Sequence, residues 1–147
     1  MTREARMLSG AILITMPTIQ YGGYFLLTSL MDKTSGYMDN PLRQNFFRAG
    51  HAHAGVIVIL SLLCQVLADA ATLPAWLLWI ARIAVPLAAI LIPAGFFLGG
   101  VSHSEGDPSP GVLLVPVGAL LLFVAIWLII LSARGVVADG EGKNGEA

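Results

Sequence analysis

Four long apolar blocks, separated by short polar segments, dominate the chain. They lie near residues 8–30, 49–68, 75–100 and 111–132. Each has roughly 20 residues or more, the length that a helix needs to cross about 30 Å of hydrocarbon. The pattern predicts an all-α integral membrane protein. Residues 1–133 are expected to form a single four-transmembrane-helix bundle, and residues 134–147 a polar, flexible tail.

Composition and charge agree with this fold class. The chain of 147 residues is 56% hydrophobic and 12% charged, with a mean hydropathy of +0.80, whereas an ordinary soluble domain is about 25% charged. The net charge of −1 gives no reason to expect a nucleic-acid partner. Cys64 is the single cysteine, so no intrachain disulfide can form. The first block is long for a signal-peptide core and no clear small-residue cleavage site follows it, so we expect it to be retained as a helix.

The four crossings predict which segments share a membrane surface. Both termini and the 69–74 turn fall on one side, with five basic residues against three on the other. The positive-inside rule therefore predicts cytoplasmic termini. The long polar loop 31–47 lies on the other side. The same surface receives all the histidines and several charged residues: His51, His53, His103, Arg43, Arg48, Glu105 and Asp107.

Polar residues interrupt the first apolar block. Pro17, Gln20, Tyr21 and Tyr24 lie within it, and a polar side chain in lipid needs a partner. Two interpretations are open. In one, Pro17 kinks the helix and Gln20 bonds to a neighbouring backbone. In the other, Gln20, Tyr21 and Tyr24 line a ligand pocket.

The third block carries two further signals. Arg82 lies about two turns from its start, so we expect its side chain to snorkel to the surface. Gly95 and Gly99 form a small-residue face that predicts close helix contact, within the chain or between copies of it.

The most informative segment runs from Phe46 to Gly55 (FFRAGHAHAG), where an aromatic and basic stretch enters the second block. Residues two apart on a helix point about 200° away from each other. His51 and His53 therefore cannot serve one small metal ion together, and we expect only one of them to face inward. The residues around them are small, Gly50 and Gly55 included, which leaves room for a flat group against the backbone.

An imidazole between small residues, with arginines at the rim, suits haem. His53 would bind the iron, and Arg48 and Arg43 would meet the propionates. In the alternative interpretation, both histidines are interfacial residues bonded to the 31–47 loop, and the small residues only allow tight packing. A zinc site built from the three histidines with Glu105 or Asp107 is disfavoured, because no His-x-x-x-His spacing exists.

The segment Ala52-His53-Ala54-Gly55, at the head of the second of four helices, resembles the membrane-bound styrene oxide isomerase family. In that family the axial histidine lies in a similar Ala-His-Ser-Gly context. The chain size, the long first loop, the Ala81-Arg82 pair and the segment Gly95–Leu98 are also similar. The resemblance implies haem b bound between subunits of a homotrimer, with His53 as the axial ligand of the iron and His51 as the other candidate.

The resemblance also implies an activity. The iron would act as a Lewis acid that opens a small apolar epoxide to an aldehyde through a 1,2-shift. The chain departs from the family at Phe97, where the family has a tyrosine, and at Ile59, where it has an asparagine. The family's acidic residue in the middle of the third helix is also missing. Tyr21, Gln20 and Tyr24 are our candidates for the polar role of these groups in catalysis.

Two other functions stay open. One is a haem-binding electron-transfer, sensing or accessory subunit without turnover, whose second axial ligand would be His51, His103, Met31 or Met38. The other is a small transporter or channel subunit, with Pro17, Gln20, Pro86 and Pro93 as broken-helix elements around a polar path.

Overall fold

A computed structural model describes the backbone of residues 1–101 and 106–144, and the side chains of 1–101 and 106–132. Its elements are α1 (Arg3–Ile14), α2 (Met16–Met31), α3 (Pro41–Asp69), α4 (Ala75–Gly100), the 3₁₀ helix η1 (Pro110–Leu113) and α5 (Leu114–Asn144). Three segments are each long and apolar enough to cross a membrane: Pro41–Asp69, Ala75–Gly100 and Pro110–Ser132. The prediction of an all-α membrane bundle is confirmed, with α1 and α2 together as the fourth rod.

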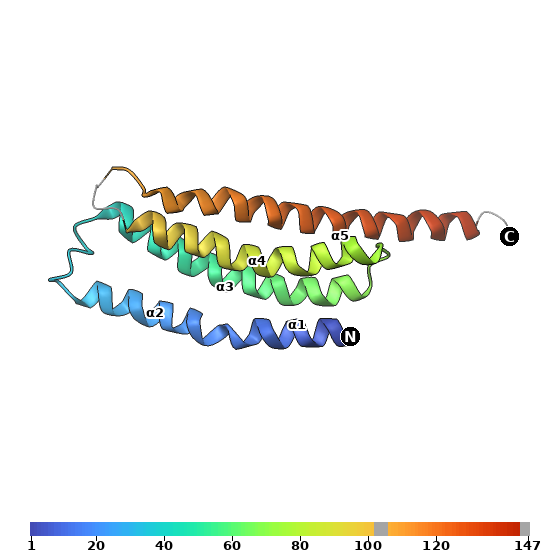
Figure 1. Cartoon of the computed structure of the whole chain (residues 1–147), viewed down its shortest axis with the longest axis horizontal. Coiled ribbons are helices and arrows are strands. Elements are labelled where there is room, and N and C mark those ends of the chain that lie inside the picture. The colour runs from blue at the N-terminus through green and yellow to red at the C-terminus, as the bar shows by residue number, and fades with distance from the viewer. Residues whose placement is uncertain (102–105, 145–147) are drawn as a thin grey trace.

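The helices run antiparallel to their neighbours along one common direction. In Figure 1, α3 and α4 lie at the centre, the α1–α2 rod lies along one side and α5 along the other. The N terminus is beside the α3–α4 turn, and the loop between α2 and α3 is at the opposite end. The first turns of α3, which carry the histidines, are therefore at the end remote from the N terminus, as the order of crossings predicted.

The first rod is bent where the sequence places Pro17. α1 ends at Ile14, and the N–H of Thr15 bonds to the carbonyl of Ile12 at 3.0 Å, one residue tighter than in an α-helix. Pro17 lies in the first turn of α2, where its missing N–H interrupts no helical bond. The predicted interruption near Pro17 is confirmed, since α1 ends at Ile14 and α2 begins at Met16. Proline does not end every helix of this chain, because α4 continues through Pro86 and Pro93.

Helix α3 begins well before the predicted 49–68 block. The side chain of Asn40 accepts a hydrogen bond from the N–H of Arg43 at 2.9 Å, and Pro41 occupies the first helical position. Asparagine as N-cap followed by proline is a strong helix start, but it precedes the apolar block and lies in polar sequence. α1 likewise starts early, with Thr2 as its cap. A search of the sequence for long apolar blocks alone therefore misses the first residues of both helices.

The predicted bounds are correct for α4 and too short for α5. α4 has the predicted bounds of 75–100. α5, predicted over 111–132, keeps helical backbone to Asn144 and so continues through most of the segment predicted as a polar tail. No proline lies between residues 133 and 144 to stop it.

Glycines allow close approach of α4 to its neighbours. A Cβ built on Gly95 would lie 2.7 Å from Cγ2 of Val115 and 2.8 Å from its backbone nitrogen. A Cβ built on Gly99 would lie 2.6 Å from the ring of Phe46. The small-residue face predicted on this helix thus serves contacts within the chain, with α5 and with α3.

A polar cluster joins α1, α3 and α4 at the N-terminal end; we call it the Arg82 cluster (Thr2, Gln65, Asp69 and Arg82). Arg82 is only 3% exposed, and its Nη2 lies 2.6 Å from Oδ1 of Asp69. Its Nη1 donates to Oε1 of Gln65 at 3.3 Å, and Nε2 of Gln65 donates to the Arg82 carbonyl at 2.9 Å. Thr2 donates to the Asp69 carboxylate from its N–H and its hydroxyl, each at 2.7 Å. The predicted snorkelling of Arg82 is wrong, because α3 supplies its partners inside the bundle.

The loop between α2 and α3 places Tyr37 in an aromatic cluster. Its side chain is 3% exposed and its ring stacks on Phe47 with 6.1 Å between centroids. Its hydroxyl is buried without a hydrogen-bond partner among the described residues. An unpaired buried hydroxyl lowers stability, so Tyr37 contributes through packing alone.

We therefore expect Tyr37→Phe to leave the free energy of unfolding unchanged or to raise it by up to about 1 kcal/mol. Tyr37→Ala should lower it by about 3 kcal/mol, because it leaves a cavity. Both are measured by denaturant titration in detergent micelles. A loss of more than about 1 kcal/mol in Tyr37→Phe would mean that the hydroxyl has a partner.

Candidate functional site

The two histidines of α3 point to different surroundings, as helix geometry predicted. The ring of His53 is exposed and packs on Phe96 of α4, with 4.9 Å between centroids. The ring of His51 lies against α2, where Cβ atoms built on Gly22 and Gly23 would meet it at 3.4 and 3.3 Å. His51 therefore faces inward and His53 outward.

His53 is held in a defined orientation. Its Nδ1 lies 2.7 Å from the carbonyl oxygen of Ala49, one turn earlier on the same helix. Because a carbonyl oxygen only accepts, Nδ1 carries the proton, and in the neutral ring Nε2 keeps its lone pair. Histidines that bind metals are commonly oriented by such a bond. The exposed face of α3 thus presents an imidazole nitrogen that is competent as a ligand.

The two predicted arginines lie at the same end of the bundle. Arg48 is exposed, and its Nη2 donates to Oε1 of Gln44 at 2.9 Å. Nε of Arg43 donates to the carbonyl of Gly100 at 3.3 Å, where a cation also meets the negative end of the α4 dipole. Arg43 therefore ties α3 to α4, while Arg48 extends from the surface of α3.

The two predicted glycines differ in what covers them. A Cβ built on Gly50 would lie 3.0 Å from the ring of Phe97 and 3.2 Å from Phe96, so the protein itself fills the space above this residue. Around Gly55 no atom lies within 4 Å of such a Cβ. A flat group can therefore approach the backbone at Gly55 without any change in the structure. At Gly50 the rings of Phe96 and Phe97 would first have to move.

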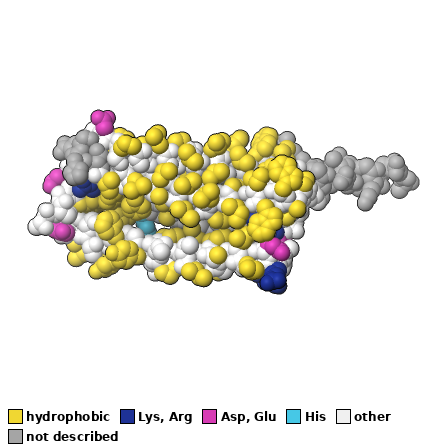
Figure 2. Space-filling model, in the orientation of Figure 1, with side chains coloured by type: hydrophobic (Ala, Val, Ile, Leu, Met, Phe, Trp, Pro, Cys, Tyr) yellow, Lys and Arg dark blue, Asp and Glu magenta, His cyan; other side chains and the backbone are white. Residues whose placement is uncertain are grey.

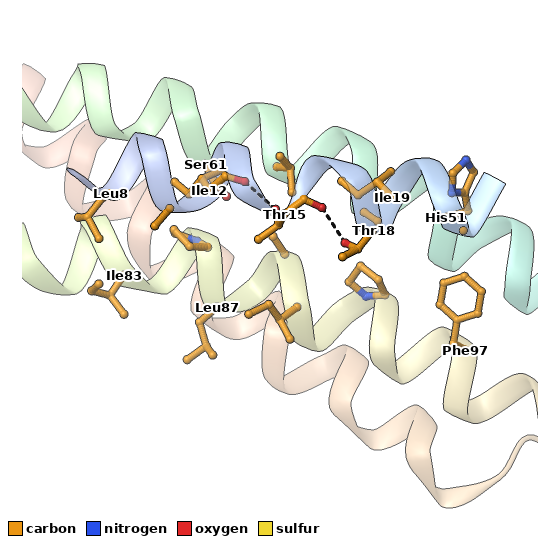
Figure 3. Close-up of a pocket in the computed structure, with 18 residues that line it drawn as sticks. Leu8, Ile12, Thr15, Thr18, Ile19, His51, Ser61, Ile83, Leu87 and Phe97 are labelled. Carbon is orange, nitrogen blue, oxygen red and sulfur yellow. Dashed lines mark hydrogen bonds between the residues drawn. The ribbon is translucent and has the colours of Figure 1, made fainter. Parts of the chain in front are cut away.

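A cavity of about 570 Å³ lies between the α1–α2 rod and the α3–α4 pair; we call it the inner cavity. Figure 3 shows His51 and Phe97 at one end and Leu8 and Ile83 at the other. In Figure 2 a histidine is visible through the hollow between the rod and the rest of the bundle. The walls are almost wholly apolar, so the polar path that a transporter would use is not formed here.

The three candidate catalytic residues do not line this cavity. Tyr21 and Tyr24 are 69% and 62% exposed, with their rings 6.4 Å apart, and Gln20 is exposed beside them. The residues of the α1–α2 rod that do line it recur at helical spacing: Leu8, Ala11, Ile12, Thr15, Thr18, Ile19 and Gly22. Gln20, Tyr21 and Tyr24 fall between these positions and point away from the cavity, so the predicted pocket is not this cavity.

Two parts of this arrangement were not predicted, namely the inner cavity and the Arg82 cluster. The zinc alternative needs His103, which lies outside the described residues, together with Glu105 or Asp107. Within the described part of the chain, no three His, Cys, Asp or Glu side chains gather as a metal site. Comparison with protein-family models, curated proteins and solved structures gives no match.

Proposed function

We propose that this membrane protein binds haem b through Nε2 of His53. The observation that carries the proposal is the 2.7 Å hydrogen bond from Nδ1 of His53 to the Ala49 carbonyl, which leaves Nε2 directed away from its own backbone. Phe96 supports the ring on one side. Because the ring is exposed on the outer face of α3, the haem would be covered by a second copy of the chain, in a homo-oligomer that the family resemblance suggests is a trimer.

The surroundings of His53 fit the other parts of a haem. Arg48 has a neutral partner in Gln44, and a propionate would form a stronger, charge-assisted bond with the same guanidinium. Arg43 adds positive charge at the same end of the bundle. The open space at Gly55 does not belong to this site as it stands, because Gly55 is two residues from His53 and points to the other side of α3.

The activity that we propose is isomerisation of a small apolar epoxide to an aldehyde. His53 would hold the haem, and its iron would supply Lewis-acid chemistry for opening the epoxide. An exposed site on a membrane helix suits a substrate that arrives through the lipid. Tyr21, Gln20 and Tyr24, on the outer face of α2, would act on that substrate from a neighbouring copy. We also propose cytoplasmic termini, since basic residues remain in excess at that end with Arg82 left out of the count, four against three.

The test is an absorption spectrum and a pyridine haemochrome assay on detergent-purified protein expressed with haem supplied. We expect a Soret band in the wild type and in His51→Ala, and its loss in His53→Ala because the iron loses its ligand. Added imidazole should restore part of the band in His53→Ala. A colourless wild type would exclude haem binding. Loss of the Soret band in His51→Ala alone would identify His51, which faces the inner cavity, as the residue that binds the iron.

The same preparation separates an enzyme from an electron carrier. Cyanide should shift the Soret band of the wild type if the sixth position is open, and should leave it unchanged if a second side chain fills that position. An epoxide-to-aldehyde assay with styrene oxide then tests turnover. Unchanged turnover in Tyr21→Phe would remove this residue from the candidates for catalysis.

A further inference from the structure

The inner cavity has the size and shape of a ligand site of its own. Its volume of about 570 Å³ falls within the range of roughly 300–1,000 Å³ that is typical of small-molecule pockets. It lies on the opposite side of α3 from the exposed ring of His53, is lined by the α1–α2 rod, α3 and α4, and is open on one side. What it binds depends on the few polar groups that its walls present.

The hydroxyl groups on the cavity wall already donate hydrogen bonds to backbone carbonyls. Thr15 Oγ1 donates to the carbonyl of Ile12 at 2.6 Å, and Thr18 Oγ1 donates to that of Thr15 at 2.6 Å, as the dashed lines in Figure 3 show. Ser61 Oγ donates to the carbonyl of Ile57 at 2.8 Å. Each hydroxyl hydrogen therefore points back to its own helix, and the wall presents mostly methyl and methylene groups.

His51 is the exception. Its ring lines the cavity beside Phe97, and none of the described residues forms a hydrogen bond with it. A neutral imidazole has one donor and one acceptor, and the half-buried ring of His51 offers both to a ligand in the cavity. No Lys, Arg, Asp or Glu is among the described residues of the lining, so a charged ligand would have no counter-ion.

From these observations we propose that the inner cavity binds an uncharged apolar molecule with one hydrogen-bonding oxygen, a hydroxyl or a carbonyl, which pairs with His51. The apolar part lies along the wall toward Leu8 and Ile83, and the oxygen lies at the end beside Phe97. The oxygen belongs either to a free small molecule or to the ester of a membrane lipid. This site is separate from the haem proposal, since it uses the other face of α3.

Photolabelling of the full chain in detergent tests the proposal. The probe is a long-chain alcohol with a diazirine at mid-chain, and labelled peptides are identified by mass spectrometry. We expect labelling between residues 8 and 22 and between residues 83 and 97. Excess dodecanol should suppress it several-fold to about tenfold more effectively than dodecane, as one hydrogen bond would give.

Three variants make the test specific. His51→Leu keeps an apolar wall but removes the imidazole, so the advantage of dodecanol over dodecane should disappear. Ala54→Leu fills the cavity and should reduce labelling by the alcohol probe at least fivefold. Ala52→Leu, at an exposed position of the same helix outside the lining, should leave labelling unchanged. Cavity labelling should persist in His53→Ala, so this site and the haem site can fail separately.

Other outcomes would overturn the proposal. Equal labelling of the exposed face of α5 and of the cavity walls would indicate ordinary lipid contact. So would wild-type labelling in Ala54→Leu, or equal competition by dodecanol and dodecane in the wild type. A diazirine phospholipid identifies the source: labelling of the same peptides with the same His51 dependence assigns the oxygen to a lipid ester, and its absence assigns it to a free molecule.

Discussion

Asp69→Asn should lower the free energy of unfolding. The substitution keeps the shape of the side chain and removes the charge that neutralises Arg82, which is 3% exposed. Removing one partner of an ion pair leaves the other charge uncompensated, which is unfavourable for a guanidinium as buried as that of Arg82. The bonds that Thr2 donates to the same carboxylate weaken as well. Denaturant unfolding in mixed micelles, followed by circular dichroism, measures the change.

Two further variants separate the ion pair from the general effect of losing an acid. Asp39→Asn, at an exposed position in the loop between α2 and α3, should change the unfolding free energy by less than about 0.5 kcal/mol. The double change of Asp69 and Arg82 to leucine should recover most of the loss, because no buried charge remains. A loss in Asp69→Asn no larger than that in Asp39→Asn would mean that Arg82 finds water or another partner.

The second large effect is expected at the contact of α4 with α5. Gly95→Ala should destabilise the fold by about 1–3 kcal/mol, as overpacking does in other cores. The added methyl group would lie 2.8 Å from the backbone nitrogen of Val115, which cannot move aside as a flexible side chain can. The two helices must separate, and the same unfolding measurement should detect it.

Gly10→Ala is the matched control. It makes the same chemical change within a helix, but nothing lies within 4 Å of the new Cβ. Alanine favours helix over glycine by roughly 1 kcal/mol, so this variant should be as stable as the wild type or slightly more stable. If Gly95→Ala and Gly10→Ala have the same free energy of unfolding, α5 has room to adjust, and the contact at Gly95 does not limit the packing of α4 on α5.

Apolar length and helical period were enough to predict the bundle and the divergence of the two histidines, because both depend only on the geometry of single helices. What each histidine touches depends on how neighbouring helices are rotated, and one sequence does not determine that. The contact of His51 with Gly22 and Gly23 could not be foreseen for this reason. The same holds for the outward position of Tyr21.

Arg82 is a different case, because the sequence contains a signal that apolar length does not capture. Gln65 and Asp69 are four residues apart and so share one face at the end of α3. The turn that follows is short, and it brings Arg82 back beside that face, 13 residues after Asp69. A search for polar residues at helical spacing on either side of a short turn would have favoured an ion pair over snorkelling.

The bend at Thr15 links the inner cavity to the thickness of the bilayer. α3, α4 and α5 are continuous helices, which respond to a thinner or thicker membrane mainly by tilting, and α4 can also bend at Pro86 and Pro93. The α1–α2 rod can also change its angle at Thr15, where the helical ladder is already interrupted. Thr15 and its neighbours Ile12 and Thr18 line the cavity. Lipids of different chain length would therefore change the width of the cavity before they disturb the rest of the bundle.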